Sequence, residues 1–293
     1  MRGEGEVAVS ARTMVVIDDG VPRESIELLR AACACRGVTF DVVEARDFDF
    51  ASAGPLEPGT LLFRPATSRA AMRVEQHLWG PGVVTFHRSP ADLHRAWPCP
   101  TLVLARAGVP VPRTTYVCSR SRERLRGAVA WAGGLPVVLK GMGSEGGVGV
   151  VRVDTMAGLF STVDLALAQG MEPELCEYVA DALHWRLVVV GERVVAAYPN
   201  PTMPGDFRSA PSEDPREYRG EAPAGLGEVA VRAVAAFGVE FGGVDVLVDG
   251  AGRPWVLEVN SPCYYPQAQE VAGIDVAGAM VDHLLMRAGV GPV

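Results

Sequence analysis

The sequence predicts a mixed α/β (α+β) protein, built from an N-terminal βαβ domain and two α+β subdomains. Three observations support this fold class. Short apolar strands alternate with amphipathic helices in the first third of the chain, a glycine-rich stretch lies between two apolar strands in the middle, and two strands with acidic residues lie near the end. The length of 293 residues suits one large domain or two to three small ones that share a cleft.

The N-terminal third has a βαβ pattern, which indicates a small parallel sheet. A domain is therefore predicted over residues 13–88, after a disordered leader at residues 1–12. The predicted elements, in chain order, are a strand at Met14 to Asp18, a helix at about Arg23 to Arg36, strands at Val38 to Val43 and Leu61 to Arg64, a helix at Ser68 to Trp79 and a strand at Val83 to Phe86.

From Pro90 onward the pattern is that of two α+β subdomains, predicted at residues 89–178 and 179–293. The stretch from Pro199 to Pro223 is a long polar loop, and such loops are usually functional or disordered. The predicted helices lie at Thr101 to Ala107, Arg122 to Trp131, Met156 to Ala168, Gly225 to Phe237 and Asp275 to Met286. The predicted strands lie at Thr115 to Cys118, Val137 to Lys140, Val148 to Val153, Leu175 to Val179, Trp185 to Val190, Arg193 to Tyr198, Gly243 to Val248 and Trp255 to Val259.

Composition and charge narrow the class of partners. The formal net charge is -8 and no basic cluster outweighs its acidic neighbours, so nucleic acid is not an expected partner. No segment approaches the roughly 20 consecutive apolar residues of a membrane span. The six cysteines show no C-x-x-C pair and no metal-ligand spacing, which favours a reduced, cytoplasmic protein.

The segment LPVVLKGMGSEGGVGVV carries the strongest chemical signal. A strand delivers Lys140, the single lysine of the chain, directly into a run of glycines. Glycines let a backbone approach a polyphosphate closely, and a lysine adds a point charge to a phosphate oxygen. The order of residues differs from a P-loop, and strand–loop–strand differs from a dinucleotide fingerprint. For the loop alone, an ordinary glycine-rich hairpin is the alternative. The predicted nucleotide contacts are Lys140, Gly143, Ser144, Gly146, Gly147 and Gly149.

The segment GGVDVLVDGAGRPWVLEVNSP carries a second group of polar residues on two apolar strands. Asp245 lies on the first strand, and Glu258 and Asn260 lie two residues apart on the second, so they share a sheet face. Two carboxylates and an amide oxygen form a hard-oxygen site suited to Mg²⁺ (or Mn²⁺) with nucleotide phosphates. The alternative is a strand-end salt bridge with one of the many arginines.

With both features, the chain resembles the ATP-grasp superfamily and, within it, the RimK-type carboxylate–amine ligases. The resemblance covers about Pro90 to Leu285. It rests on LARAGVPVPRT, LPVVLKGMGSEGGVGV, CEYV, WRLVVVGERVVAA, GDFRS, GGVDVLVD, LEVNSP and GIDVAGAMV. It implies an ATP-grasp fold in which a small N-terminal domain precedes two subdomains that clamp ATP.

The resemblance also implies roles for individual residues. Lys140 would hold the α-phosphate region, and the loop to Gly149 would close over the β- and γ-phosphates. The backbone of Glu177, Tyr178 and Val179 would read the adenine edge. Two arginines, Arg186 and Arg208, match arginines at the reaction centre of relatives. Asp245, Glu258 and Asn260 match the magnesium ligands.

The sequence departs from the family pattern at two phosphate-side positions. Relatives carry an Asp-Lys pair where this chain has Ala96 and Trp97, so Arg95 or no residue supplies that phosphate contact. The asparagine that often follows GDFRS in relatives is Ala210 here.

Two further departures lie near the expected ribose and acceptor sites. The family's Asp-x-Arg is His184-Trp185-Arg186 in this chain, so His184 or Asp181 would replace the ribose partner, with a surface histidine as the alternative. After Asn260 the sequence reads SPCYYPQAQ. The side chains of residues 263–265 (Cys263, Tyr264 and Tyr265) would shape an unusual acceptor pocket, with core packing as the alternative.

The function that the resemblance implies is an ADP-forming amide or peptide ligase that acts through an acyl phosphate. Its expected substrate is an amino acid or a small peptide, its expected cofactors are ATP and Mg²⁺ (or Mn²⁺), and self-association is left open. One alternative is an enzyme of the same fold with a non-amine acceptor, either a cyclising ligase or a kinase. The other is a nucleotide-binding protein without catalytic activity.

Overall fold

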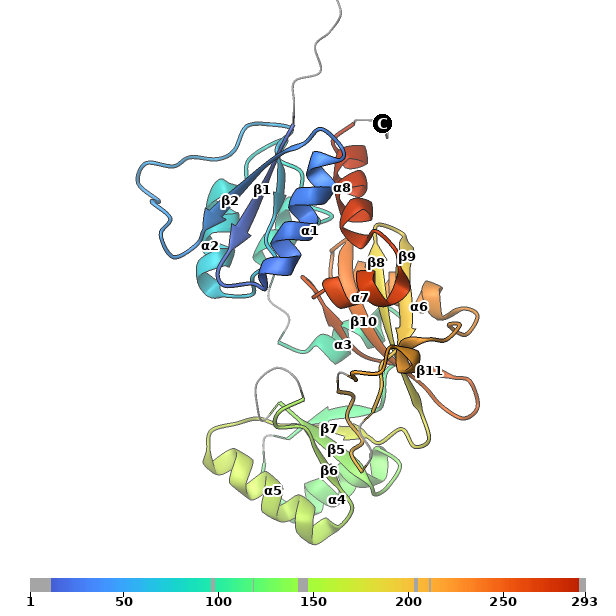
Figure 1. The fold of residues 1–293 in the computed structure, drawn as a ribbon. Coiled ribbons are helices and arrows are strands. Elements are labelled where there is room, and N and C mark those ends of the chain that lie inside the picture. The colour runs from blue at the N-terminus through green and yellow to red at the C-terminus, as the bar shows by residue number, and fades with distance from the viewer. Residues whose placement is uncertain are drawn as a thin grey trace, which may run out of the picture.

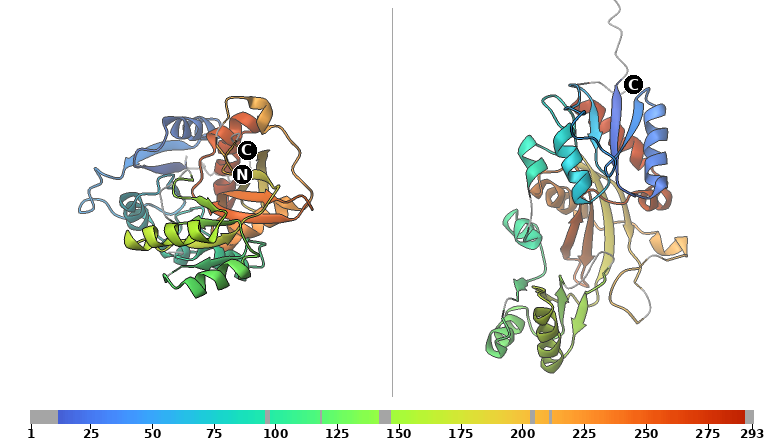
Figure 2. Two further views of the ribbon diagram at one scale, coloured as in Figure 1. Left: turned by 90° about the horizontal axis from the view of Figure 1, so that it is seen from below. Right: turned by 90° about the vertical axis from the view of Figure 1, so that its left-hand side faces the viewer.

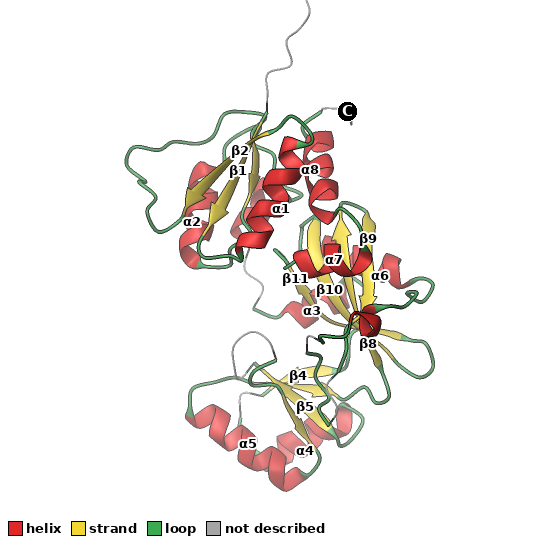
Figure 3. Ribbon diagram, viewed as in Figure 1, coloured by secondary structure: helices red, strands yellow, loops and turns green. Residues whose placement is uncertain are grey.

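The computed structural model describes residues 12–95, 98–117, 119–141, 147–202, 205–210 and 212–289. Within them the chain forms three sheets that follow one another along the long axis of the molecule (Figure 1). The N-terminal sheet lies at one end, the sheet of the glycine-rich region at the other, and the C-terminal sheet between them. Helices pack against each of the three sheets (Figure 3).

The N-terminal sheet confirms the predicted βαβ pattern. Its strands β1 (Thr13–Asp18), β2 (Thr39–Glu44) and β3 (Leu61–Phe63) are parallel, in the order β2-β1-β3. Helices α1 (Arg23–Ala34) and α2 (Arg69–Leu78) cover its two faces. Alternate residues of the central strand β1 enter two different hydrophobic clusters, as a strand buried on both faces requires.

The predicted strand at Val83 to Phe86 is wrong as a regular strand. Val84 forms one parallel bridge to Leu61, and the pairing stops there. Phe86 instead turns toward the core, with its ring 5.3 Å from that of Phe63 and 5.2 Å from that of Phe241. The backbone pairs instead with residues 238–240, since Glu240 N–H donates to the Phe86 carbonyl oxygen and Arg88 N–H donates to that of Gly238, each at 2.8 Å. The 3-10 helix η1 (Pro90–His94) and helix α3 (Pro100–Arg106) follow.

The sheet of the glycine-rich region is antiparallel, in the order β4-β7-β5-β6. Helices α4 and α5 cover one of its faces, and Figure 1 shows them on the side away from the C-terminal sheet. The predicted strand at Val148 to Val153 is shorter in the structure because residues 147–149 form a turn. The elements are β4 (Thr114–Tyr116), α4 (Arg122–Trp131), β5 (Val137–Lys140), β6 (Val151–Val153), α5 (Met156–Ala168) and β7 (Glu174–Glu177).

The C-terminal sheet is also antiparallel, in the order β11-β10-β8-β9. Helix α6 packs on one face, and α7 and α8 pack on the other. Helix α7 and the 3-10 helix η2 were not predicted, and η2 lies inside the long polar loop. The elements are β8 (Leu183–Val190), β9 (Arg193–Pro199), η2 (Pro215–Tyr218), α6 (Leu226–Ala236), β10 (Phe241–Val248), β11 (Pro254–Asn260), α7 (Pro266–Ala272) and α8 (Val276–Arg287).

The N-terminal and C-terminal sheets share one hydrophobic core. One buried cluster contains Met14 and Leu29 from the N-terminal region together with Phe241 and Met280 from the C-terminal region. Helix α8 returns to lie beside α1 (Figures 1 and 2). No helix of the described residues is long and apolar enough to cross a membrane.

Candidate nucleotide and metal site

Lys140 is the last residue of β5 and lies opposite Glu174 of β7. Directly opposite residues of antiparallel strands share a face. Val137 and Leu139 enter the core under α4 and α5, so Lys140 and Val138 belong to the other face, toward the C-terminal sheet. Burial raises the pKa of Glu174, and the Lys140 ammonium opposes that rise.

The glycine-rich loop depends on glycine backbone geometry at three described positions. Gly141, Gly147 and Gly149 have φ angles of 76°, 76° and 80°, in the left-handed region that residues with a side chain rarely adopt. The sequence therefore uses glycine here because the loop conformation requires it. The other predicted loop contacts, Gly143, Ser144 and Gly146, lie outside the described residues.

Arg208 joins the two sides of the site. It comes from the loop after β9, and its Nη1 donates to the carbonyl oxygen of Gly147 at 3.2 Å. The same guanidinium binds Asp206, with Nη2 2.7 Å from Oδ2. Hydrogen bonds from the side chain and backbone of Arg208 hold the pKa of Asp206 well below its usual range. The segment GDFRS thus contacts the glycine-rich loop through Arg208.

The segment Glu177 to Val179 links the two subdomains. The Glu177 carboxylate accepts two hydrogen bonds from Arg113, with Nε–Oε2 at 2.8 Å and Nη2–Oε1 at 3.0 Å. No backbone hydrogen bond joins Tyr178 or Val179 to another residue of the described ranges. Their peptide groups are therefore available to a ligand, as the predicted adenine contact requires.

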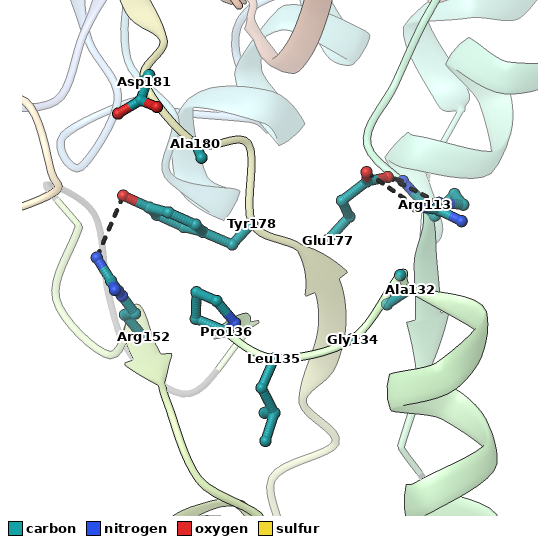
Figure 4. A pocket seen from close by; sticks show the side chains of 11 residues that line it. Arg113, Ala132, Gly134, Leu135, Pro136, Arg152, Glu177, Tyr178, Ala180 and Asp181 are labelled. Carbon is teal, nitrogen blue, oxygen red and sulfur yellow. Dashed lines mark hydrogen bonds and ion pairs between the residues drawn. The ribbon is translucent and has the colours of Figure 1, made fainter.

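A pocket of about 380 Å³ lies beside this segment, with Tyr178 and Arg152 on one side and the Arg113–Glu177 pair on the other (Figure 4). Arg152 Nη1 donates to the Tyr178 hydroxyl oxygen at 3.3 Å, and the guanidinium carbon lies 4.5 Å from the ring centroid. Sequence reasoning did not select Arg152. Its place between two valines of a strand was the available signal, because alternate strand residues face opposite sides.

Four strands of the C-terminal sheet bring polar side chains into one row. Tyr198 of β9 lies opposite Arg186 of β8. Arg186 lies opposite Asp245 of β10, which in turn lies opposite Glu258 of β11. The valines on either side of Asp245 enter the core beneath α6, so the row occupies the other face of the sheet. Sequence reasoning missed Tyr198, because its place in the row depends on strand register.

Asp245 is the centre of this row and is 5% exposed. Its Oδ2 accepts hydrogen bonds from Arg186 Nη1 at 2.8 Å and Asn260 Nδ2 at 3.2 Å. Its Oδ1 accepts one from His184 Nε2 at 3.0 Å. Asn260 Nδ2 also donates to Glu258 Oε1 at 2.9 Å. The structure thus brings the three predicted metal ligands together. The salt bridge considered as an alternative is present too, between Asp245 and Arg186.

The charges of this cluster fit a divalent cation. Burial and the neighbouring charge of Asp245 raise the pKa of Glu258. Burial also opposes ionisation of Asp245, but the hydrogen bond from His184 and the charge of Arg186 lower its pKa. A hard cation such as Mg²⁺ would relieve the repulsion between the carboxylates. The described residues contain no group of three or more His, Cys, Asp or Glu side chains suited to a metal. A donor set at this place would need the Asn260 amide oxygen besides the two carboxylates, and the predicted metal ligands stay a prediction.

The residues after β11 divide between the site and the core. Cys263 is buried beside Arg186, and burial raises the pKa of its thiol to about 12. Tyr265 is 1% exposed and its hydroxyl donates to the Ser25 carbonyl of α1, so the packing alternative is confirmed for this residue. Tyr264 remains exposed and its hydroxyl contacts a glutamate of α1.

The residues considered as replacements for missing family contacts lie in different places. Arg95 binds Asp92 at the end of η1, with Nη1–Oδ1 at 3.0 Å. His184 has a side chain only 9% exposed, so the surface-histidine alternative is wrong. Asp181 lines the pocket beside Tyr178 and has a φ of 49°. Nothing in the structure tests whether these three residues contact a nucleotide, so their roles stay predictions.

Two subdomains with a glycine-rich loop on one and a carboxylate row on the other define a nucleotide clamp. Residues 97–284 match the family of RimK-like ATP-grasp domains. The chain belongs to this family, and its fold is an ATP-grasp fold.

Individual relatives agree with that assignment. The chain is 31% identical over 191 residues to a probable alpha-L-glutamate ligase from a Picosynechococcus species, which is 64% of this chain and 62% of that protein. Among solved structures, the ATP-grasp ligase PsnB complexed with a minimal precursor has a TM-score of 0.71 at 18% identity, covering 94% of this chain and 99% of PsnB. A RimK domain protein from Sphaerobacter thermophilus has a TM-score of 0.66 at 24% identity, covering 94% of this chain and all of that chain.

Proposed function

We propose that this protein is an ATP-dependent, ADP-forming carboxylate–amine ligase. One observation carries the proposal: Arg208 bridges from the C-terminal subdomain to the glycine-rich loop, while Asp245, Glu258 and Asn260 form a carboxylate–amide cluster on the C-terminal sheet. A protein that merely stored a nucleotide would not need both a bridging arginine and a cation-binding cluster.

The proposed nucleotide site uses residues of both subdomains. Lys140 contacts the α-phosphate region, the glycine-rich loop covers the outer phosphates, and the backbone at Tyr178 and Val179 contacts adenine. Asp245, Glu258 and Asn260 would hold Mg²⁺ or Mn²⁺, which when bound neutralises charge on the phosphates and acts as a Lewis acid.

The first chemical step is phosphoryl transfer. A carboxylate oxygen of the substrate attacks the γ-phosphorus in line, the bond from that phosphorus to the β,γ-bridging oxygen breaks, and ADP leaves with the electron pair. An acyl phosphate remains. The Arg208 guanidinium stabilises charge on the transferring phosphoryl group. Arg186, which lies in the row and is held there by Asp245, provides a second positive charge for the substrate carboxylate.

The second step forms the amide bond. The neutral amine nitrogen attacks the acyl carbon, the carbon–oxygen bond to phosphate breaks, and phosphate leaves with the electron pair. The nitrogen gives up one proton to the leaving phosphate or to water. Water would hydrolyse the acyl phosphate and waste ATP, so the site must be covered during this step. The contact of the GDFRS segment with Gly147 supports such a cover.

The proposed substrates are amino acids or short peptides. The curated relatives are named as probable alpha-L-glutamate ligases, and PsnB was solved with a minimal precursor. The chain spans 62% of the length of the first of these relatives, so glutamate is the first substrate to test rather than an assigned one.

The test is an ADP-release screen with ATP and Mg²⁺ over amino acids and short peptides, singly and in pairs, starting with glutamate. The expected result is ADP and phosphate in equal amounts, together with a condensed product found by mass spectrometry. The Glu258→Gln variant is the matched control, because it keeps the side-chain shape and removes one carboxylate charge.

The products separate the competing functions. ADP with a phosphorylated product and no free phosphate would indicate a kinase. Free phosphate with an intramolecular product would indicate a cyclising ligase. ATP binding without any turnover across the screen would contradict catalysis and leave a nucleotide-binding protein.

A further inference from the structure

We propose that His184 is a positioning residue, which fixes the carboxylate of Asp245 and thereby the cation site. This inference rests on the proposed function, because it concerns the donor set through which that function would bind a divalent cation.

The location of His184 shows that it is not a surface residue. It lies on β8 two positions before Arg186, so both side chains share one sheet face. Its Nε2 lies 3.0 Å from Oδ1 of Asp245, and the two side chains are 9% and 7% exposed. A hydrogen bond between groups so well shielded from water is not readily replaced by a solvent contact.

The donors around Asp245 are distributed unequally between its two oxygens. Oδ2 accepts from Arg186 and Asn260, whereas His184 is the one donor to Oδ1 within the described residues. A turn about the Cβ–Cγ bond moves both oxygens, so donors on both resist it more strongly than donors on Oδ2 alone. The bond from His184 holds the second oxygen in place and stabilises the buried charge there.

The orientation of Asp245 matters because its neighbours also belong to the donor set. Asn260 Nδ2 donates to both Asp245 and Glu258, so a turn of the Asp245 carboxylate would disturb the amide and the second carboxylate together. Groups that orient a metal ligand typically affect metal affinity by ~10–100-fold. His184 acts in this way, through Asp245 and without contacting the cation itself.

The experiment measures Mn²⁺ binding by electron paramagnetic resonance in the presence of ADP, with the full chain. His184→Gln keeps an amide donor of similar reach, and His184→Met has a similar length without a donor. We expect His184→Met to weaken Mn²⁺ binding by ~10–100-fold and His184→Gln to stay within about threefold of the wild type. ADP affinity without metal should be unchanged in both variants.

Several outcomes would overturn the role of His184. Unchanged Mn²⁺ affinity in His184→Met would do so, and so would equal losses in both variants, which indicate a direct ligand or a packing role. A loss of metal-free ADP affinity would make His184 a nucleotide contact instead. Thermal unfolding checks each variant. If His184→Met does not fold, His184→Asn replaces it, because its amide is one methylene too short to reach Asp245.

A further control separates this inference from the proposed function. Glu258→Gln should abolish tight Mn²⁺ binding whatever His184 does. Wild-type protein that binds no Mn²⁺ would overturn both the cation site and the role of His184. Binding that depends on Glu258 but not on the donor at residue 184 would overturn the positioning role alone.

Discussion

Lys140 differs from the arginines of the site in what it contacts. Arg113, Arg186 and Arg208 each bind a carboxylate. Lys140 forms no ion pair with the described residues, and the Glu174 carboxyl opposite it has a raised pKa because of burial. Because no carboxylate of the described residues forms an ion pair with its ammonium, Lys140 suits a role in binding phosphate.

Replacing Lys140 by methionine should weaken ATP binding by ~10–100-fold, since hydrogen bonds to charged groups contribute about 1.5–3 kcal/mol. Isothermal titration calorimetry measures the effect. Arg124→Met, on the helix-covered side of the same subdomain, removes one positive charge elsewhere and serves as control. Undiminished ATP affinity in Lys140→Met would contradict the assignment of the phosphate site.

At the residue scale, the sequence was sufficient to predict those contacts that depend only on local strand geometry. The two-residue spacing of Glu258 and Asn260 and the short connection from Asp245 were enough to place all three together. The contacts of Asp245 with His184 and Arg186 join residues 61 and 59 positions apart. They depend on the register between β8 and β10, which no local pattern specifies.

At the element scale, periodic segments were predicted well and segments governed by distant packing were not. The helices at Arg122 to Trp131 and Met156 to Ala168 agree with α4 and α5. The strand at Val83 to Phe86 was wrong as a regular strand because the backbone from Phe86 to Arg88 pairs with residues 238–240, which are distant in sequence. Helix α7 was not predicted, although α3, which has the same length of seven residues, was.

Helix α5 begins at a side-chain cap that can be tested. Thr155 Oγ1 accepts a hydrogen bond from the Gly158 N–H at 3.1 Å, which satisfies one free donor of the first turn. Thr155→Ala should lower the free energy of unfolding by ~1 kcal/mol in urea titrations. Ser161→Ala, inside the same helix, should change it by less than about 0.5 kcal/mol. Equal effects of the two variants would contradict a specific capping role.

A second prediction at this scale concerns the loop between β9 and α6, because this loop carries Arg208 to the glycine-rich loop. Arg208→Ala should reduce kcat by at least ~100-fold and change ATP affinity much less, since the guanidinium acts mainly on the transferring phosphoryl group. Steady-state kinetics and calorimetry measure the two quantities. Arg216→Ala removes another exposed arginine of the loop as a control. Similar losses in kcat for both variants would contradict a specific role for Arg208.

At the scale of the whole molecule, ion pairs and hydrogen bonds join the C-terminal helix to the N-terminal region, although the two are far apart in sequence. Glu240, just before β10, binds both His283 and Arg287 of α8, each at 2.9 Å. Arg287 also donates to the carbonyl oxygens of Thr85 and His87 in the N-terminal region. Glu240 and Arg287 together thus connect three parts of the fold. The predicted domain boundaries remain a proposal.

The packing of α3 also crosses those predicted boundaries. Leu104 of α3 and the nearby Val109 belong to the hydrophobic cluster beneath the C-terminal sheet. The sequence placed both residues in the subdomain of the glycine-rich loop, because that subdomain follows directly in the chain. Packing between elements distant in sequence decides such an assignment, and the local periodicity of α3 carries no information about its partner.

The connection at Glu240 should make the molecule sensitive to acid. Burial opposes ionisation of Glu240, but the hydrogen bond from His283 and the charge of Arg287 lower its pKa below 4.5. A carboxyl whose pKa is lower in the folded than in the unfolded state contributes its full stabilisation above the unfolded value, and loses it as pH falls through the folded value. Unfolding free energies measured from pH 7 down to pH 3.5 should therefore fall more steeply for the wild type than for Glu240→Gln. Hydrogen exchange in α8 should accelerate over the same range, and equal slopes for the two proteins would show that Glu240 does not contribute to the acid sensitivity.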